Sequence, residues 1–141
     1  DVGNADPQAL TVAVSAAQAV ERIGMPEAQI ILSQAATYVA CAPKSNAACN
    51  AIFAANEEVK RSGNLPIPTH LQDAHYKGAA KLGHGTGYKY AHDYPNHYVE
   101  QQYLPYELTG KKYYEPSWNG YEAKIREHMK RIKDEAKQKE D

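Results

Sequence analysis

Side chains that could bind nucleic acid are concentrated between Leu65 and Tyr121. This stretch contains ten of the eleven tyrosines and the only tryptophan, and lysines are interleaved with the rings. A cation beside an aromatic face is typical of surfaces for single-stranded nucleic acid, where stacking contributes about 1–3 kcal/mol per base. The candidate residues for such a surface are Tyr88, Lys89, Tyr90, Lys111 and Lys112.

Other interpretations of the same residues remain open. Tyrosine has a large apolar face and one polar tip, so the rings could form an irregular core whose hydroxyl groups connect loops. Amphipathic rings are also preferred at protein interfaces. The lysines could lie on a solvated surface with their aliphatic stems over the rings.

The same stretch holds five of the six histidines, which are candidates for metal binding or acid–base chemistry. A zinc site needs three or four converging ligands, but the spacings match no zinc-ligand pattern and no cysteine lies nearby. His92 beside Asp93 could be an oriented base, yet no serine or cysteine nucleophile stands in a recognisable frame. We therefore predict hydrogen-bonded structural histidines, no metal ion, no cofactor and no catalytic residue. The five are His70, His75, His84, His92 and His97.

A glycine-rich segment, GHGTG, runs from Gly83 to Gly87 and invites comparison with phosphate-binding loops. It lacks the GxxxxGK[ST] spacing, and no strand followed by a helix is expected around it. We predict a tight turn instead.

Composition sets limits on the class of protein. A chain of 141 residues is large enough for one domain, and its net charge of -1 excludes a globally basic nucleic-acid binder but not a local basic patch. No segment has the length or apolarity of a membrane span, and no signal peptide is recognisable. Cys41 and Cys49 fit reduced thiols that fill a core in the cytoplasm. The chain begins at Asp1 rather than methionine, and we expect it to be part of a longer protein.

The first 63 residues predict three antiparallel helices that position this stretch. Asp6 before Pro7 is a favourable helix start, and Gly24 a favourable end. A second helix is expected from Pro26 to Pro43, and a third from the cap Ser45 to Gly63. The expected apolar face of the first helix contains Leu10, Val14, Ala17, Val20 and Ile23, and that of the third Ala48, Ile52, Ala55 and Val59.

Alanine dominates these helices, with sixteen in the first sixty residues. Small side chains let helix axes approach closely, but they bury less apolar area per residue than leucine. Such an array is weakly stable alone, and we expect it to pack on the tyrosine-rich segment or on another copy of itself.

Residues 64–118 are predicted to be mostly irregular, with a short helix at 71–82 and a helical turn at 99–103. Asn119 and Glu122 form a plausible capping box for a last helix in 119–141 that buries Ile125, Met129 and Ile132. The charged tail from residue 133 is expected to fray. The fold class is therefore mainly α, with a long irregular tyrosine-rich segment in which a short β-hairpin is an alternative.

Several long motifs resemble the C-terminal domain of the RarA/MgsA family, AAA+ ATPases associated with replication and recombination. They are AVERIGMPEAQIILSQA (19–35), PKSN (43–46), LGHGTGYKYAHDYPNHYVEQQYLP (82–105) and GKKYYEPSWNGYE (110–122). The family is related to clamp-loader subunits and to the Werner-helicase-interacting protein. The resemblance covers nearly the whole chain; one departure is Ala91, where the family usually has proline.

The resemblance implies a clamp-loader-collar-like domain that gathers a bacterial ATPase into a homotetramer. ATP and Mg would bind in upstream domains absent from this chain, so the fragment itself would not be an enzyme. The full-length proteins of the family act on DNA with single-stranded character at stalled forks, in replication, recombination and repair. This implies a cytoplasmic, nucleoid-associated protein with DNA, and a single-stranded-DNA-binding protein, as partners.

Two hypotheses follow. The first is self-association through the helices, supported by the tyrosine-rich segment. The second is direct binding of single-stranded DNA by the tyrosines and lysines of residues 76–114.

Overall fold

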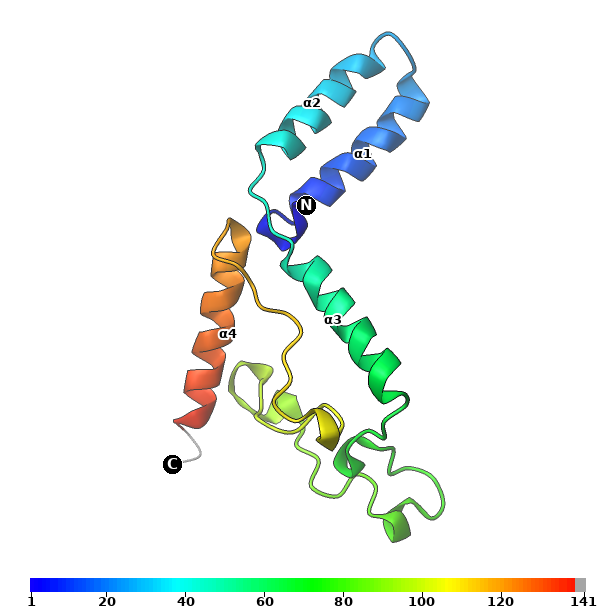
Figure 1. Ribbon diagram of the computed structural model, residues 1–141, viewed down its shortest axis with the longest axis vertical. Helices are drawn as coiled ribbons and strands as arrows, with labels where there is room; N and C mark the ends of the chain where they lie inside the picture. Colours follow the sequence, from blue (N-terminus) through cyan, green and yellow to red (C-terminus); the bar gives the residue numbers. More distant parts are fainter. Residues whose placement is uncertain (139–141) are drawn as a thin grey trace. The chain divides into compact units, whose positions relative to one another are not determined.

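The computed structural model describes residues 1–138, in which the regular structure is helical (Figure 1). The α-helices are α1 (Gln8–Ile23), α2 (Ala28–Cys41), α3 (Ala47–Ser62) and α4 (Tyr121–Lys137). The predicted mainly α fold is confirmed. The alternative of a short hairpin is wrong, because residues 1–138 contain no strand.

The chain forms two compact units. The first contains Asp1–Ala54 and Tyr113–Glu127, and the second contains Ala55–Lys112 and the chain from His128 onward. Both α3 and α4 begin in the first unit and end in the second.

The hairpin of α1 and α2 lies within the first unit, with the two helices side by side and antiparallel (Figure 1, blue and cyan). The amide of Gln8 donates to Asp6 Oδ1 at 3.0 Å, and the amide of Gly24 donates to the carbonyl oxygen of Val20 at 3.0 Å. Gly24 has a φ of +76°, a region that favours glycine. The predicted start and end of this helix are therefore confirmed.

The predicted apolar face of α1 is wrong. Leu10 is 74% exposed, and Val14 and Ile23 are also exposed. Ala16 is buried instead, and Ala16 and Ala19 line a groove between α1 and α2 together with the half-buried Val12 and Ile31. Short side chains permit close packing of the two helices, and this leaves the larger aliphatic side chains outside.

The helix ends of α3 follow the sequence signals, whereas its buried face does not. The amide of Ala47 donates to Ser45 Oγ at 3.1 Å, and Gly63 follows the last residue with a φ of +66°. Ile52 and Val59, which belong to the predicted face, are exposed, while Glu58 is only 8% exposed. Both cysteines are exposed free thiols, so their predicted role as core fillers is also wrong.

The tyrosine-rich segment is built from short turns. The predicted helix at 71–82 is replaced by 3-10 turns at Thr69–Leu71 and Ala79–Leu82, since Gly78 between them has a φ of +96°. The Asp73 carboxylate also accepts the amide of His75 at 2.9 Å, a local bond that competes with a helix. The remaining turns are Ala91–Asp93, Pro95–His97 and Tyr106–Leu108.

The helical turn predicted at 99–103 is also wrong, because these residues have no regular secondary structure and Gln101 bonds to another segment. The side chain of Gln101 donates to the carbonyl oxygen of Lys89 at 3.0 Å and accepts its amide at 3.4 Å. In α4, Ile125, Met129 and Ile132 are half-buried rather than buried. The tail predicted to fray continues α4 to Lys137, and residues 139–141 lie outside the described part.

The buried apolar side chains are small. The largest fully buried side chains in the described part of the chain are Glu122 and Pro68. The buried hydrophobic residues are Ala5, Ala9, Ala16, Ala28, Ala42, Ala79 and Val99. Alanine and one valine contribute little transfer free energy, so the chain has little apolar core for its length.

Candidate functional site

Large apolar side chains of the first unit lie on its surface. Leu10 on α1 is 74% exposed, Ile30 on α2 is 72% exposed, and Phe53 on α3 is 62% exposed. Monomeric proteins scatter single apolar residues over their surfaces, but here the exposed residues are larger than the buried ones. Further exposed members within the first unit are Val14, Ile23, Met25, Leu32, Ile52, Trp118 and Tyr121.

A buried carboxylate joins separate chain segments within the first unit. Glu122 at the start of α4 is completely buried and accepts three hydrogen bonds. Ser45 Oγ donates at 2.6 Å, the amide of Ser117 at 2.8 Å and the hydroxyl of Tyr114 at 3.0 Å. Asn4 in turn donates to the Tyr114 hydroxyl at 3.2 Å. The carboxylate thus joins the segment before α3 to the segment before α4, and Tyr114 links the N-terminal segment to them.

The electrostatics of Glu122 depend on these donors. Burial alone would raise the pKa of Glu122, but the hydrogen bonds from Ser117, Ser45 and Tyr114 outweigh it and hold this pKa below its ordinary value. Burial, with the bond to Glu122, raises the pKa of Tyr114. Glu122 is therefore ionised at neutral pH, and it has a structural role.

This arrangement corrects the predicted capping box. The Glu122 carboxylate accepts the amide of Ser117 instead of that of Asn119. The side chain of Asn119 donates to the carbonyl oxygen of Lys44 at 2.9 Å, and its amide donates to Ser117 Oγ at 3.1 Å. The spacing of Asn119 and Glu122 correctly identified Glu122 as the capping carboxylate. It could not show that the chain turns at Gly120, so that the amide of Ser117, two residues before Asn119, is the donor.

Backbone segments approach closely at the same junction. A Cβ atom added to Gly120 would lie 2.2 Å from the carbonyl oxygen of Ala5 and 2.5 Å from Pro43 Cγ. Gly120 also has a φ of +53°. Only glycine fits this position without displacing the N-terminal segment.

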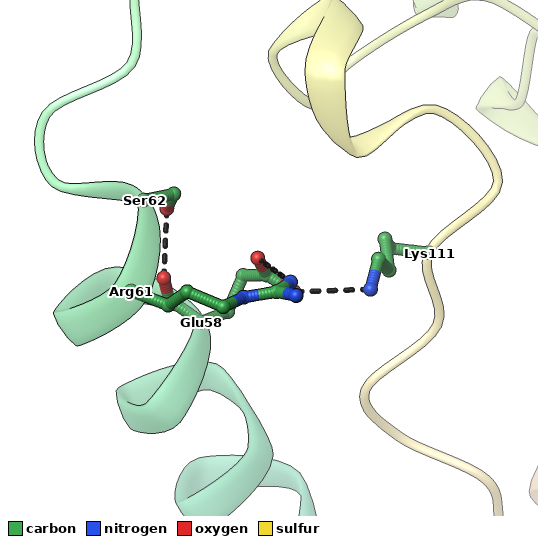
Figure 2. Close-up of polar contacts among 4 residues, drawn as sticks. All are labelled: Glu58, Arg61, Ser62 and Lys111. Atoms are coloured by element: carbon green, nitrogen blue, oxygen red, sulfur yellow. Dashed lines mark hydrogen bonds and ion pairs between the residues drawn. The ribbon is translucent and has the colours of Figure 1, made fainter.

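A second buried carboxylate, Glu58, lies in the second unit (Figure 2). It pairs with Arg61 one turn later on α3, and its other oxygen lies 3.2 Å from Nζ of Lys111. The hydrogen bond from Arg61 and the proximity of Lys111 hold the pKa of Glu58 below its ordinary value, despite the opposing effect of burial. The Ser62 hydroxyl donates to the carbonyl oxygen of Glu58 at 2.7 Å.

Local backbone structure brings Lys111 to this position. After the turn at 106–108, the amide of Lys111 donates to the carbonyl oxygen of Leu108 at 3.0 Å. Gly110 between them has a φ of +80°, which reverses the chain. The Glu58 carboxylate thus holds two cations that are fifty positions apart in the sequence.

The residues predicted to bind nucleic acid have different environments. Tyr88 and Tyr90 are each 53% exposed, and Lys112 is exposed. The ring of Tyr90 lies 5.1 Å from that of His92, and Lys111 pairs with Glu58. The backbone of Lys89 is bonded to the Gln101 side chain.

Sequence reasoning missed Arg61. Its signal was the spacing of three between Glu58 and Arg61 in the last turn of a predicted helix, a spacing that places side chains on one face.

Comparison with known proteins identifies the family of the chain. Residues 1–133 match the family described as MgsA AAA+ ATPase C terminal. The chain belongs to this family. The suspected resemblance to the RarA/MgsA proteins is thereby confirmed.

Curated relatives agree with this assignment. The chain is 48% identical over 120 residues to Replication-associated recombination protein A of Bacillus subtilis, covering 85% of this chain and 28% of the relative. It is 41% identical over 130 residues to the protein of the same name from Escherichia coli K12, covering 92% and 29%. It is 36% identical over 116 residues to ATPase WRNIP1 of Dictyostelium discoideum, covering 82% and 13%. The chain thus spans less than a third of each of these relatives.

Four of the five histidines predicted to be hydrogen-bonded in this MgsA C-terminal domain have side-chain partners. The prediction is wrong for His70, whose buried Nε2 has no hydrogen-bond partner among the described residues. His75 Nδ1 lies 2.8 Å from Asp73 Oδ1, and His84 Nδ1 lies 2.6 Å from the hydroxyl of Tyr76. His92 and His97 face each other with their Nδ1 atoms 3.2 Å apart. Residues 1–138 contain no group of three or more potential metal ligands. None of the helices described here is long and apolar enough to cross a membrane.

Proposed function

We propose that this member of the MgsA family is the self-association module of an AAA+ ATPase. It assembles four copies in the manner of a clamp-loader collar. The observation that carries the proposal is the distribution of apolar side chains, with alanines inside and Leu10, Ile30 and Phe53 outside.

The energetics favour a partner surface of the same kind. Full burial of one leucine, isoleucine or phenylalanine side chain contributes about 1.5–3 kcal/mol. The internal alanines cannot supply this contribution, but an interface that covers the exposed side chains can. A stable interface buries roughly 1,200–2,000 Å², an area that requires residues from more than one helix.

In this proposal the chain is one domain of a longer ATPase, and the other domains bind and hydrolyse ATP. ATP and Mg²⁺ bind in its upstream domains, and hydrolysis acts on DNA with single-stranded character at stalled forks. The printed name of the Bacillus and Escherichia relatives, Replication-associated recombination protein A, supports a role in DNA replication, recombination and repair. The protein works in the cytoplasm at the nucleoid, and a single-stranded-DNA-binding protein is a candidate partner.

Substitution of the most exposed side chains tests the assembly. The double variant Leu10→Ser, Ile30→Ser removes two apolar side chains that contribute little inside the monomer. We expect its self-association to weaken at least about tenfold, since a loss of about 1.4 kcal/mol is a factor of ten. Sedimentation equilibrium of the 141-residue chain measures this change.

A matched control uses the same two helices. Gln18 and Gln29 are exposed polar residues of α1 and α2, and Gln18→Ser, Gln29→Ser should associate like the parent. If the parent and the Leu10, Ile30 variant associate equally strongly, α1 and α2 do not form the interface.

A second candidate function is a surface for single-stranded DNA formed by Tyr88, Lys89, Tyr90, Lys111 and Lys112. It is favoured by the exposure of the two tyrosines and of Lys112. Fluorescence anisotropy with labelled oligothymidylate at two salt concentrations is the test, because phosphate contacts produce a steep salt dependence. An absence of binding at low salt would end this candidate.

A further inference from the structure

A hollow of about 390 Å³ lies on the second unit beside the glycine-rich segment 83–87. Its lining includes His70, Asp73 and the exposed side chain of Tyr88. Pockets for small ligands have volumes of roughly 300–1,000 Å³, so this hollow has room for one flat ring system.

Glycine shapes the wall of the hollow. The segment 83–87 consists of turns, as its composition predicts. The amide of Gly85 donates to the carbonyl oxygen of Thr69 at 2.9 Å, and a Cβ atom added to Gly85 would lie 2.7 Å from Cβ of Ala74. The turn therefore packs directly against the preceding part of the chain and brings Tyr88 to the same hollow.

Two polar side chains of the hollow can take part in hydrogen bonds with a ligand. Asp73 Oδ1 accepts the amide of His75 at 2.9 Å and lies 2.8 Å from Nδ1 of the same residue, and these contacts hold the pKa of Asp73 below its ordinary value. Asp73 is therefore an oriented, ionised acceptor, and its side chain is 65% exposed with capacity for a further donor. Nε2 of His70 is buried and lacks a partner in the described part of the chain, so the wall also contains an unfilled hydrogen-bonding position.

An aromatic face beside a carboxylate fits a nucleobase better than a phosphate group. Tyr88 offers a ring for stacking, an interaction that every base can make. The charge of Asp73 repels phosphate but accepts hydrogen bonds from an exocyclic amino group, as carboxylates do from N4 of cytosine. Thymine has a carbonyl oxygen at the same position, which a carboxylate repels.

We propose that this hollow binds one unstacked base of single-stranded nucleic acid, with Tyr88 stacking on the base and Asp73 accepting a hydrogen bond from its amino group. Cytosine is the smallest base with such a group and is the preferred occupant. This inference rests on the second candidate function and gives it a base-selective site.

A comparison of two homopolymers tests the selectivity. Fluorescence anisotropy of the 141-residue chain at neutral pH should show labelled oligodeoxycytidylate binding at least about threefold more tightly than oligothymidylate of the same length. Both strands make the same phosphate contacts, so the ratio of their affinities reports on the bases. Asp73→Asn should abolish this ratio, whereas Asp93→Asn removes the same charge from another exposed position of the second unit and should preserve it.

Removal of the ring tests the stacking contact. Tyr88→Leu should weaken the binding of both strands at least about fivefold. Tyr106→Leu changes another exposed tyrosine of the second unit and should bind like the parent. The side chains of Asp73 and Tyr88 are more than half exposed, so both variants should fold like the parent, which circular dichroism checks.

The outcomes separate the site from the function that it serves. A parent chain that binds neither strand at low salt overturns the nucleic-acid function and this site together. Equal binding of the two strands, a cytosine preference that survives Asp73→Asn, or unchanged binding by Tyr88→Leu overturns the site alone. Binding of labelled dCMP without binding of either strand would show a mononucleotide site and contradict the proposal.

Discussion

The hairpin of α1 and α2 and the junction around Glu122 lie in the same unit and follow opposite packing rules. The hairpin places alanines inside and large aliphatic residues such as Leu10 outside. The junction buries a charged residue and satisfies it with three donors. The junction is complete within one chain, whereas the hairpin lacks a cover for its outer side chains. The difference indicates which region maintains the fold of the monomer and which is available for assembly.

Removal of the charge of Glu122 should have the largest effect, and it tests whether the junction maintains the fold. Glu122→Gln leaves buried donors of Ser45, Tyr114 and Ser117 poorly paired, and we expect unfolding free energy to fall by about 2–4 kcal/mol. Urea denaturation followed by circular dichroism measures this loss. Glu127→Gln on an exposed position of the same helix should change stability by less than about 0.5 kcal/mol. Equal stabilities of the two variants would show that the junction does not maintain the fold.

A methyl group at Gly120 tests the close approach of the backbone. Gly120→Ala places a Cβ atom against the carbonyl oxygen of Ala5 and requires a positive φ, so we expect a loss of about 1–3 kcal/mol. Gly63→Ala is the control, because Gly63 has a similar φ of +66° but no atom within 4 Å of the added Cβ. The difference between the thermal midpoints of the two variants measures the destabilisation caused by the steric clash at Gly120. Equal midpoints would mean that the N-terminal segment moves aside at little cost.

Acid should destabilise the junction around Glu122. The pKa of Glu122 is lower in the folded chain than its ordinary value of 4.5, so the unfolded chain binds more protons between the two values. Stability is therefore fully present above about pH 4.5 and is lost as pH falls through the folded pKa. Glu58 changes in the same direction.

The variant Glu122→Gln should show a shallower loss of stability with acid than the parent in the same titration. A parallel acid dependence of the two would mean that this carboxylate does not titrate with folding.

The positions of the four α-helices could be predicted from sequence because their end signals are local. Asp6, Ser45, Gly24 and Gly63 mark ends that depend only on neighbouring residues. The buried helix faces could not be predicted, because periodicity favours the stripe with the largest aliphatic residues and here alanine packs inside.

The long-range contacts of Glu58 and Glu122 could not be predicted from the sequence either. Lys111 could be named as a cation, but its pairing with Glu58 depends on the turn through Gly110. Glu122 was recognised as a helix-start residue, but its bonds to Ser45 and Tyr114 join segments 77 and 8 positions away.

The mass of the 141-residue chain in solution tests the central claim most directly. Light scattering coupled to size-exclusion chromatography should give four times the 15.6 kDa chain mass at tens of micromolar protein. It should give a smaller mass for Leu10→Ser, Ile30→Ser under the same conditions. A parent mass of one chain that does not change with concentration would contradict self-association through these helices.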